Sequence, residues 1–208
     1  SDLSSLLQSA LDDSLRCARL IPDIDNRLRS ALFCSRAGEK LYARLEPSLP
    51  GCTLHHIRVD PETGKRQKGE WLLDMVIADG DLTHTPITQV HVAMECESQT
   101  STAALHADFG KLLVIRAATK LYLHGLNHQT VDGADDLIEE RIKLAAGWIQ
   151  AHDDPATQWY LGFWPSPEKT AHAASIWDEL EPGQAFASAL EDLDAQLVFQ
   201  LFNMTANT

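Results

Sequence analysis

The segment QVHVAMECESQTS, from Gln89 to Ser101, constrains the fold of this chain more than any other. Its apolar and β-branched residues predict a strand over VHVAMECE, and successive side chains of a strand point to opposite faces of a sheet. The predicted faces carry Val90, Val92, Met94 and Cys96 on one side and His91, Ala93, Glu95, Glu97 and Gln99 on the other. We therefore expect an apolar face that packs on a core and a second face that is acidic.

The two glutamates of this strand, Glu95 and Glu97, are attached roughly 7 Å apart on the predicted acidic face. Burying two like charges without compensation costs several kcal/mol. Two arrangements remain open on this strand alone: either the acidic face is exposed to solvent, or a metal cation or a lysine lies beside it.

A third acid interrupts another predicted strand, WLLDMVI, at residues 71–77. Alternation places Trp71, Leu73, Met75 and Ile77 on one apolar face and Asp74 on the other, between Leu72 and Val76. The preceding TLHHIRVD and PETGKRQKGE predict a strand and a basic turn, so that 53–77 forms a hairpin. An unpaired aspartate in mid-strand is destabilising, so Asp74 also requires a partner.

A lysine follows in the predicted helix over residues 101–118. Lys111 falls on a helical stripe that we expect to pack on the sheet, formed by Ala104, Ala107, Asp108, Val114, Ile115 and Ala118. A lysine on such a stripe would pair with carboxylates of the sheet. The alternative is a lysine that extends to solvent and pairs with Asp108 one helical turn earlier.

The other segments predict an α/β fold with a central mixed sheet flanked by helices. Apolar spacing predicts two helices within residues 1–50, separated by IPDIDNRL, then a strand at 120–125, a helix at 135–150, a strand at 158–164 and mostly helix from 166 to 202. We expect a single domain over 1–208, with a core at about 31–125, an N-terminal helical region at 1–50 and C-terminal additions at 126–208.

Charge and cysteine content narrow the class of protein. The formal net charge is −13, so the surface as a whole repels polyanions and any nucleic-acid contact must be local. The four cysteines have no CxxC spacing, which indicates neither a zinc knuckle nor a disulfide scaffold and fits a reducing cytoplasm. No apolar run approaches the roughly 18 to 20 residues of a membrane span, and no signal peptide is evident, so we expect no membrane partner.

Over roughly 31–125, the order of predicted elements resembles the core of the PD-(D/E)XK, or restriction-endonuclease-like, nuclease superfamily. That order is a helix, a strand, a strand with Asp74, a strand with Glu95-Cys-Glu97, a helix and a strand. Asp74 matches the family's aspartate and Glu95 its first following acid, whereas Glu97 occupies the family's lysine position. Lys111 resembles the lysine that some branches carry on the following helix. An acid on the first core helix assists in some members, and Glu39 or Glu46 could fill that place.

The resemblance implies a nuclease that depends on Mg²⁺ or Mn²⁺, with Asp74, Glu95 and Glu97 as metal ligands and Lys111 orienting water or the scissile phosphate. We expect DNA rather than RNA as its nucleic acid. Two alternatives stay open. One is the same fold with a degraded site that binds or regulates a protein partner, and the other is a glycosidase that uses paired carboxylates.

Other motifs contribute less. Lys65, Arg66 and Lys68 lie on the predicted hairpin tip and could clamp phosphate, although a solvated turn also explains them. A zinc pair of His124 and His128 is not expected, because they flank the end of a strand rather than share a helix face. The WYLGFW aromatics are expected in the core. The chain has no GxSxG, GxxxxGK[ST] or GxGxxG motif. This excludes the commonest classes of serine hydrolase, NTPase and dinucleotide-binding protein.

Overall fold

The computed structural model describes residues 2–18, 20–21, 26–126, 131–152, 155–165 and 199–205. The helices are α1 (Leu3–Ala18), α2 (Asn26–Leu45), the short 3₁₀ helix η1 (Glu46–Ser48), α3 (Thr102–Val114) and α4 (Val131–His152). The strands are β1 (Cys52–His56), β2 (Arg58–Val59), β3 (Arg66–Gln67), β4 (Met75–Asp79), β5 (Gln89–Glu97), β6 (Thr119–Leu126), β7 (Gln158–Pro165) and β8 (Gln200–Asn203).

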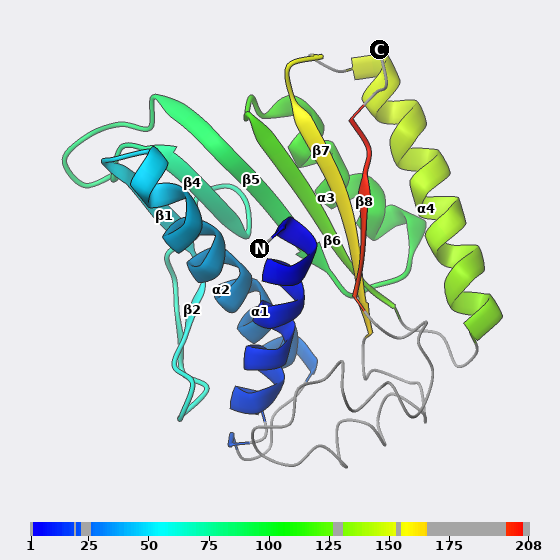
Figure 1. Cartoon of the computed structure of the whole chain (residues 1–208), viewed down its shortest axis with the longest axis horizontal. Helices are drawn as coiled ribbons and strands as arrows, with labels where there is room; N and C mark the ends of the chain where they lie inside the picture. Colours follow the sequence, from blue (N-terminus) through cyan, green and yellow to red (C-terminus); the bar gives the residue numbers. More distant parts are fainter. Residues whose placement is uncertain are drawn as a thin grey trace.

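Six of the strands form one mixed sheet in the order β1-β4-β5-β6-β7-β8 (Figure 1). β5, β6 and β7 run parallel, and the other neighbours pair antiparallel. β2 and β3 pair as a separate two-stranded ribbon, so the predicted hairpin consists of β1 and β4 with this ribbon between them. The predicted α/β fold with a central mixed sheet flanked by helices is confirmed.

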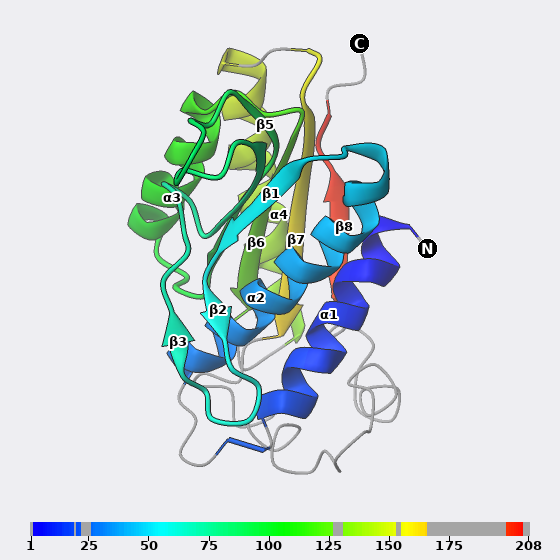
Figure 2. The same ribbon diagram turned by 90° about the vertical axis from the view of Figure 1, so that its left-hand side faces the viewer.

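Helices cover both faces of this sheet, α1 and α2 on one side and α3 and α4 on the other (Figure 2). Parallel strands require a crossover, and α3 joins β5 to β6 while α4 joins β6 to β7. Crossovers of one hand place both helices on the same face. Among the described helices, none has the combination of length and apolarity needed to cross a bilayer.

The predicted faces of β5 hold for most of the strand but fail at its start. Val92 and Met94 pack in the core beneath α1 and α2, with Cys96 against it, whereas Val90 packs with the α3 and α4 core. The pairing with β4 steps from Ile77↔Val92 to Ala78↔Val90, so β5 holds one extra residue there. This β-bulge reverses the face of the residues that precede it.

The predicted alternation before β4 is also wrong. Trp71 and Leu73 pack with the core beneath α3 and α4, whereas Met75 and Ile77 face α1 and α2. Leu72 has a φ of 63°, in the left-handed region, and regular strand begins only at Met75. The period-two alternation of β4 therefore does not extend back through Trp71 and Leu73.

The packed stripe of α3 differs from the predicted one. Its buried residues are Leu105, Phe109 and Leu112, while Val114 is 85% exposed and the helix ends there rather than at residue 118. The bulky residues, which bury more apolar area than the alanines, decide the orientation of the helix. Lys111 consequently lies beside the packed stripe and not on it.

The C-terminal prediction is partly outside the described residues and partly wrong. The predicted helical segment 166–202 falls mostly on residues 166–198, which are not among those described. Its last residues form β8, which pairs antiparallel with β7, because pairing satisfies the backbone groups along β7. The expected burial of the β7 aromatics is confirmed for Trp159, Phe163 and Trp164.

Candidate active site and the adjoining cleft

Asp74 is held against β5 by a backbone hydrogen bond. The pair Met75↔Met94 ends the regular ladder of β4 and β5, so Asp74 and Glu95 follow as neighbours across the two strands. The Cys96 N–H donates to Asp74 Oδ2 over 2.9 Å. Asp74, the residue before β4, thus lies next to the end of β5 that carries Glu95.

Lys111 brings its ammonium group to Glu95 from the neighbouring helix α3. The Glu95 side chain is only 2% exposed, and Lys111 Nζ lies 3.2 Å from Glu95 Oε1. The same nitrogen donates to Asp108 Oδ1 over 2.7 Å. Both predicted partnerships of Lys111 therefore occur together, and the acidic face of β5 is buried beside a cation instead of being exposed.

Around Glu95, the carboxyl groups outnumber the single ammonium group of Lys111, and the site is largely shielded from water. Burial and the charge of Asp74 outweigh Lys111 and raise the pKa of Glu95 to about 9. Burial also raises the pKa of Asp74, which is hydrogen-bonded to Glu95. For Lys111, burial opposes the charge, but the bond to Asp108 and the charge of Glu95 raise its pKa overall. The pair Asp74–Glu95 therefore retains a proton at neutral pH.

Glu97 lies one step further along the same face of β5. Its Oε1 accepts hydrogen bonds from the backbone N–H groups of Ser98 and Gln99, each over 2.7 Å. Burial and a hydrogen bond with Asp108 raise the pKa of Glu97. Asp108 therefore links Lys111 with Glu97, and all four predicted site residues belong to one connected group.

A cleft of about 530 Å³ opens beside this group, between α2 and the adjoining ends of β4 and β5. The charged and thiol-bearing residues among those that line it are Arg27, Cys34, Arg66, Glu70, Asp74, Cys96 and Glu97. Glu95 and Lys111 are not among the residues that line the cleft. Of the predicted metal ligands, Asp74 and Glu97 are the two that face it.

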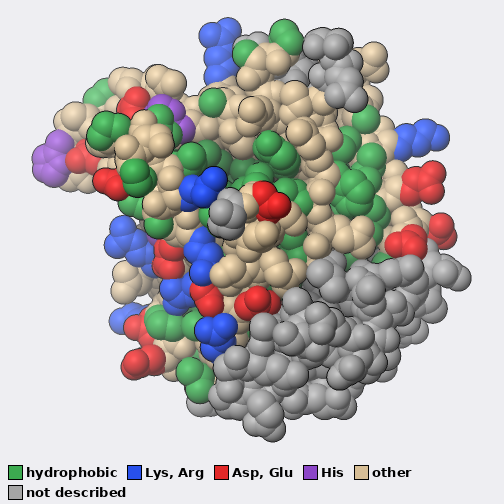
Figure 3. Space-filling view, in the orientation of Figure 1, with side chains coloured by type: hydrophobic (Ala, Val, Ile, Leu, Met, Phe, Trp, Pro, Cys, Tyr) green, Lys and Arg blue, Asp and Glu red, His purple; other side chains and the backbone are tan. Residues whose placement is uncertain are grey.

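The predicted phosphate clamp is divided by the fold. Arg66 belongs to β3 and lines the cleft, whereas Lys65 and Lys68 are exposed and do not line it. The turn that joins β2 and β3 spans residues 60–65. The basic residues therefore lie at the end of this turn and not at the tip of the ribbon. The face drawn in Figure 3 mixes Lys and Arg with Asp and Glu where α1, α2 and β2 lie, without a continuous basic stripe.

The acid expected on the first core helix does not reach the cleft. Glu39 on α2 pairs with Arg36 and lies 3.9 Å from His56, and Glu46 starts η1. The α2 residue that faces Asp74 is Cys34, whose Sγ lies 3.9 Å from the Asp74 carbonyl oxygen. Sequence reasoning missed Cys34 and Cys96 because nothing in their spacing marks them as neighbours.

The histidine pair that was not expected to bind zinc is only half described. His124 is buried in β6, stacked on Tyr122 and edge-on to Phe163, and His128 lies outside the described residues. The aromatic neighbours of His124 are those of a histidine in a protein core.

Scans of this chain against protein-family models, curated proteins and solved structures found no match.

The carboxylates of Asp74 and Glu95 offer the oxygen ligands that a hard dication prefers. Glu95 Oε1 is buried and accepts no well-aligned hydrogen bond from the described residues, although Lys111 Nζ lies within ion-pair distance. Asp74 adds a second carboxylate on the adjacent strand. Mg²⁺ and Mn²⁺ prefer such oxygen ligands, and a bound cation would replace the proton that the pair retains.

Proposed function

We propose that this protein is a divalent-metal-dependent nuclease that hydrolyses phosphodiester bonds, in a divergent branch of the PD-(D/E)XK superfamily. One observation carries the proposal: Asp74, which directly precedes β4, lies beside Glu95 of β5, and Lys111 Nζ lies 3.2 Å from Glu95 Oε1. Metal-assisted hydrolysis requires this combination of hard ligands and a nearby cation.

Each residue would have a defined part in the reaction. Asp74 and Glu95 would hold Mg²⁺ or Mn²⁺, and Glu97 would offer a further carboxylate from the edge of the cleft. The bound ion would supply Lewis acidity and lower the pKa of an attacking water. Lys111, held by Asp108 at 2.7 Å, would orient that water or balance charge that develops on the phosphate.

The cleft supports binding of a polyanion at one place on an acidic protein. Arg27 and Arg66 both line it, and arginine forms bidentate contacts with phosphate. Their guanidinium groups share the cleft with Asp74, so a phosphodiester held by them would lie next to the acids. The exposed Lys65 and Lys68 would extend the contact outward, and DNA is the nucleic acid that we expect first.

The test is hydrolysis of single-stranded DNA, double-stranded DNA and RNA with Mg²⁺ and with Mn²⁺. Lys111→Met should reduce the rate on the order of 100-fold or more while leaving binding nearly unchanged, because its contact is made in the transition state. Asp74→Asn should abolish metal-dependent cleavage. The control is Lys143→Met, which removes an exposed lysine of α4 and should retain the parent rate.

A second candidate is a degraded site that serves as a protein-binding or regulatory module. Two observations favour it: Glu97 stands where the family carries lysine, and neither Glu95 nor Lys111 lines the cleft. In that case Lys111→Met would change stability alone. Cleavage of no substrate above the Asp74→Asn background would decide for this module and against the nuclease.

A further inference from the structure

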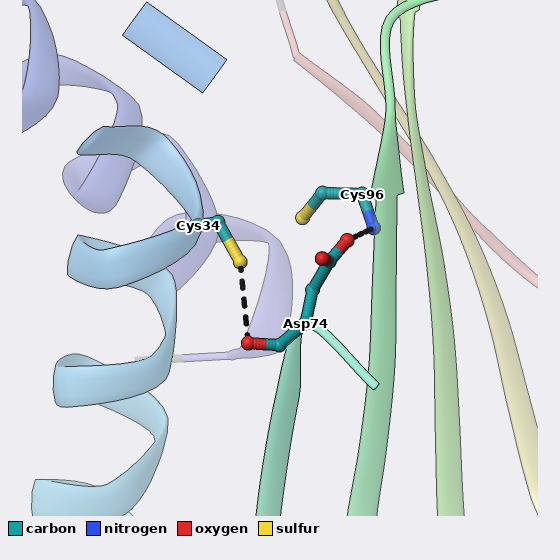
Figure 4. A group of neighbouring side chains, drawn as sticks. All are labelled: Cys34, Asp74 and Cys96. Carbon is teal, nitrogen blue, oxygen red and sulfur yellow. Dashed lines mark hydrogen bonds between the residues drawn. The ribbon is translucent and has the colours of Figure 1, made fainter. Parts of the chain in front are cut away.

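Two thiols and a carboxylate meet at the wall of the cleft, from three separate parts of the chain. Cys34 comes from α2, Asp74 from the residue before β4 and Cys96 from β5. One ligand atom of each lies within 4.8 Å of the other two. In Figure 4 both sulfur atoms point into the space between α2 and β5, where the Asp74 carboxylate also lies.

The separations are close to those of a tetrahedral zinc site. With Zn–S bonds of about 2.3 Å, two sulfur ligands of a tetrahedral ion lie about 3.8 Å apart. The two sulfur atoms lie at most 4.8 Å apart, so they must approach each other by about 1 Å or less to bind one ion. Rotation of the two cysteine side chains can supply this movement. The backbone of β5 and α2 need not move.

The surroundings already orient the ligands. The Cys96 N–H donates to Asp74 Oδ2, which orients the carboxylate beside the two sulfur atoms. Outer hydrogen bonds of this kind orient metal ligands in known sites. Cys34 is buried and Cys96 half-buried, yet both line the cleft, so a fourth coordination position would open to it.

We propose that Cys34, Cys96 and Asp74 bind one Zn²⁺, with the fourth position open to the cleft for water or a small anion. Thiolates select a borderline-soft ion such as Zn²⁺ over Mg²⁺ or Mn²⁺. Binding forms two Zn–S bonds and one Zn–O bond, and the two thiol protons pass to the buffer. Zinc binding at these residues does not require nuclease activity, because Glu95 and Lys111 take no part in it.

Cobalt(II) provides a spectroscopic probe that reports thiolate ligands directly. The full chain, reduced and freed of metal by chelation, is titrated with Co²⁺ and then with Zn²⁺. We expect a near-ultraviolet thiolate-to-cobalt charge-transfer band that saturates at one equivalent and disappears when one equivalent of Zn²⁺ is added. The double variant Cys34→Ser/Cys96→Ser should lose the band, and Asp74→Asn should weaken affinity on the order of 10-fold or more.

The chain supplies its own matched control. Cys52 is buried like Cys34, and Cys17 is half-buried like Cys96, so Cys17→Ser/Cys52→Ser removes two comparable thiols from elsewhere. This variant should retain the parent band and affinity. A band that is absent from the parent, or that survives in Cys34→Ser/Cys96→Ser, would overturn the proposal.

A second measurement needs no variant, in case the serine substitutions prevent folding. Alkylation of the parent is followed by mass spectrometry, cysteine by cysteine, with and without Zn²⁺. Zinc should slow labelling of Cys34 and Cys96 at least several-fold and leave Cys17 and Cys52 unchanged. Equal labelling with and without zinc, or a Cys34–Cys96 disulfide that forms equally in its presence, would refute zinc binding here.

Discussion

The Lys111 ammonium nitrogen lies 3.2 Å from Oε1 of Glu95, whose side chain is 2% exposed. The lysine itself is 46% exposed and also binds Asp108, so its charge is shared between two carboxylates and screened by water. It therefore does not compensate fully for the burial of Glu95 beside Asp74. The protonation of this acid should control how the stability of the protein depends on pH.

The first prediction is a loss of stability with rising pH in the absence of metal. The pKa of Glu95 is raised to about 9 in the folded protein from an ordinary value of 4.5, so the folded state binds the extra proton between these values. Stability falls with pH wherever the folded state binds more protons than the unfolded state. The contribution of Glu95 should be complete below about pH 4.5 and lost progressively towards pH 9.

Glu95→Gln isolates this effect, because glutamine has the shape of the protonated acid and does not titrate. We expect the variant to melt higher than the parent at neutral pH, with a difference that grows as pH rises, in urea or thermal unfolding with a chelator present. Glu62→Gln removes an exposed acid from the β2–β3 turn and should follow the parent. Parallel pH profiles for Glu95→Gln and the parent would contradict the prediction.

The second prediction concerns binding of a hard dication. Adding Mn²⁺ or Mg²⁺ should raise the melting temperature, because an ion that binds only the folded state stabilises it. The increase should shrink in Asp74→Asn and in Glu95→Gln, which each remove one carboxylate ligand. Thermal unfolding with increasing Mn²⁺ measures this, with Glu62→Gln as the control. Equal responses in all four proteins would exclude Asp74 and Glu95 as ligands.

The third prediction separates the basic residues of the β2–β3 ribbon. Arg66→Ala should weaken binding of DNA more than Lys65→Ala/Lys68→Ala, since Arg66 lines the cleft and the two lysines do not. Each lost phosphate contact should lower the slope of log affinity against log salt by about one. Fluorescence anisotropy at several salt concentrations gives both quantities. A larger loss in the lysine double variant would place the nucleic acid outside the cleft.

The fourth prediction concerns the backbone that precedes Asp74. Leu72 has a φ of 63° and is 73% exposed, so its side chain adds strain without packing in return. Asparagine tolerates this conformation better, and Leu72→Asn should stabilise the protein by about 0.5 to 1 kcal/mol. Leu20 is 61% exposed, and its φ is not positive. Leu20→Asn should therefore show no such gain in chemical denaturation.

The sequence by itself determined the class of fold and the neighbours of the acids on β5. Apolar residues with period two define β5, and parallel strands joined by helices follow from the order of segments along the chain. The same local period placed Glu95 and Glu97 on one face of β5, where Lys111 of α3 reaches Glu95, whereas the Asp74 carboxylate lies beside Cys34 of α2. The faces of β5 and the proximity of Lys111 to Glu95 depend on residues that are a few positions apart in the chain or on adjacent elements.

Only the tertiary structure decided which of these residues meet the cleft and what else lies there. The bulge opposite Ile77 and the start of β4 at Met75 move side chains to the other face of the sheet although the apolar pattern of the sequence continues, because both depend on how β4 and β5 pair. Cys34 and Cys96 are 62 residues apart and carry no spacing motif, and they meet because α2 packs across the ends of β4 and β5. Contacts of this kind depend on how whole elements pack, which no local pattern in the chain encodes.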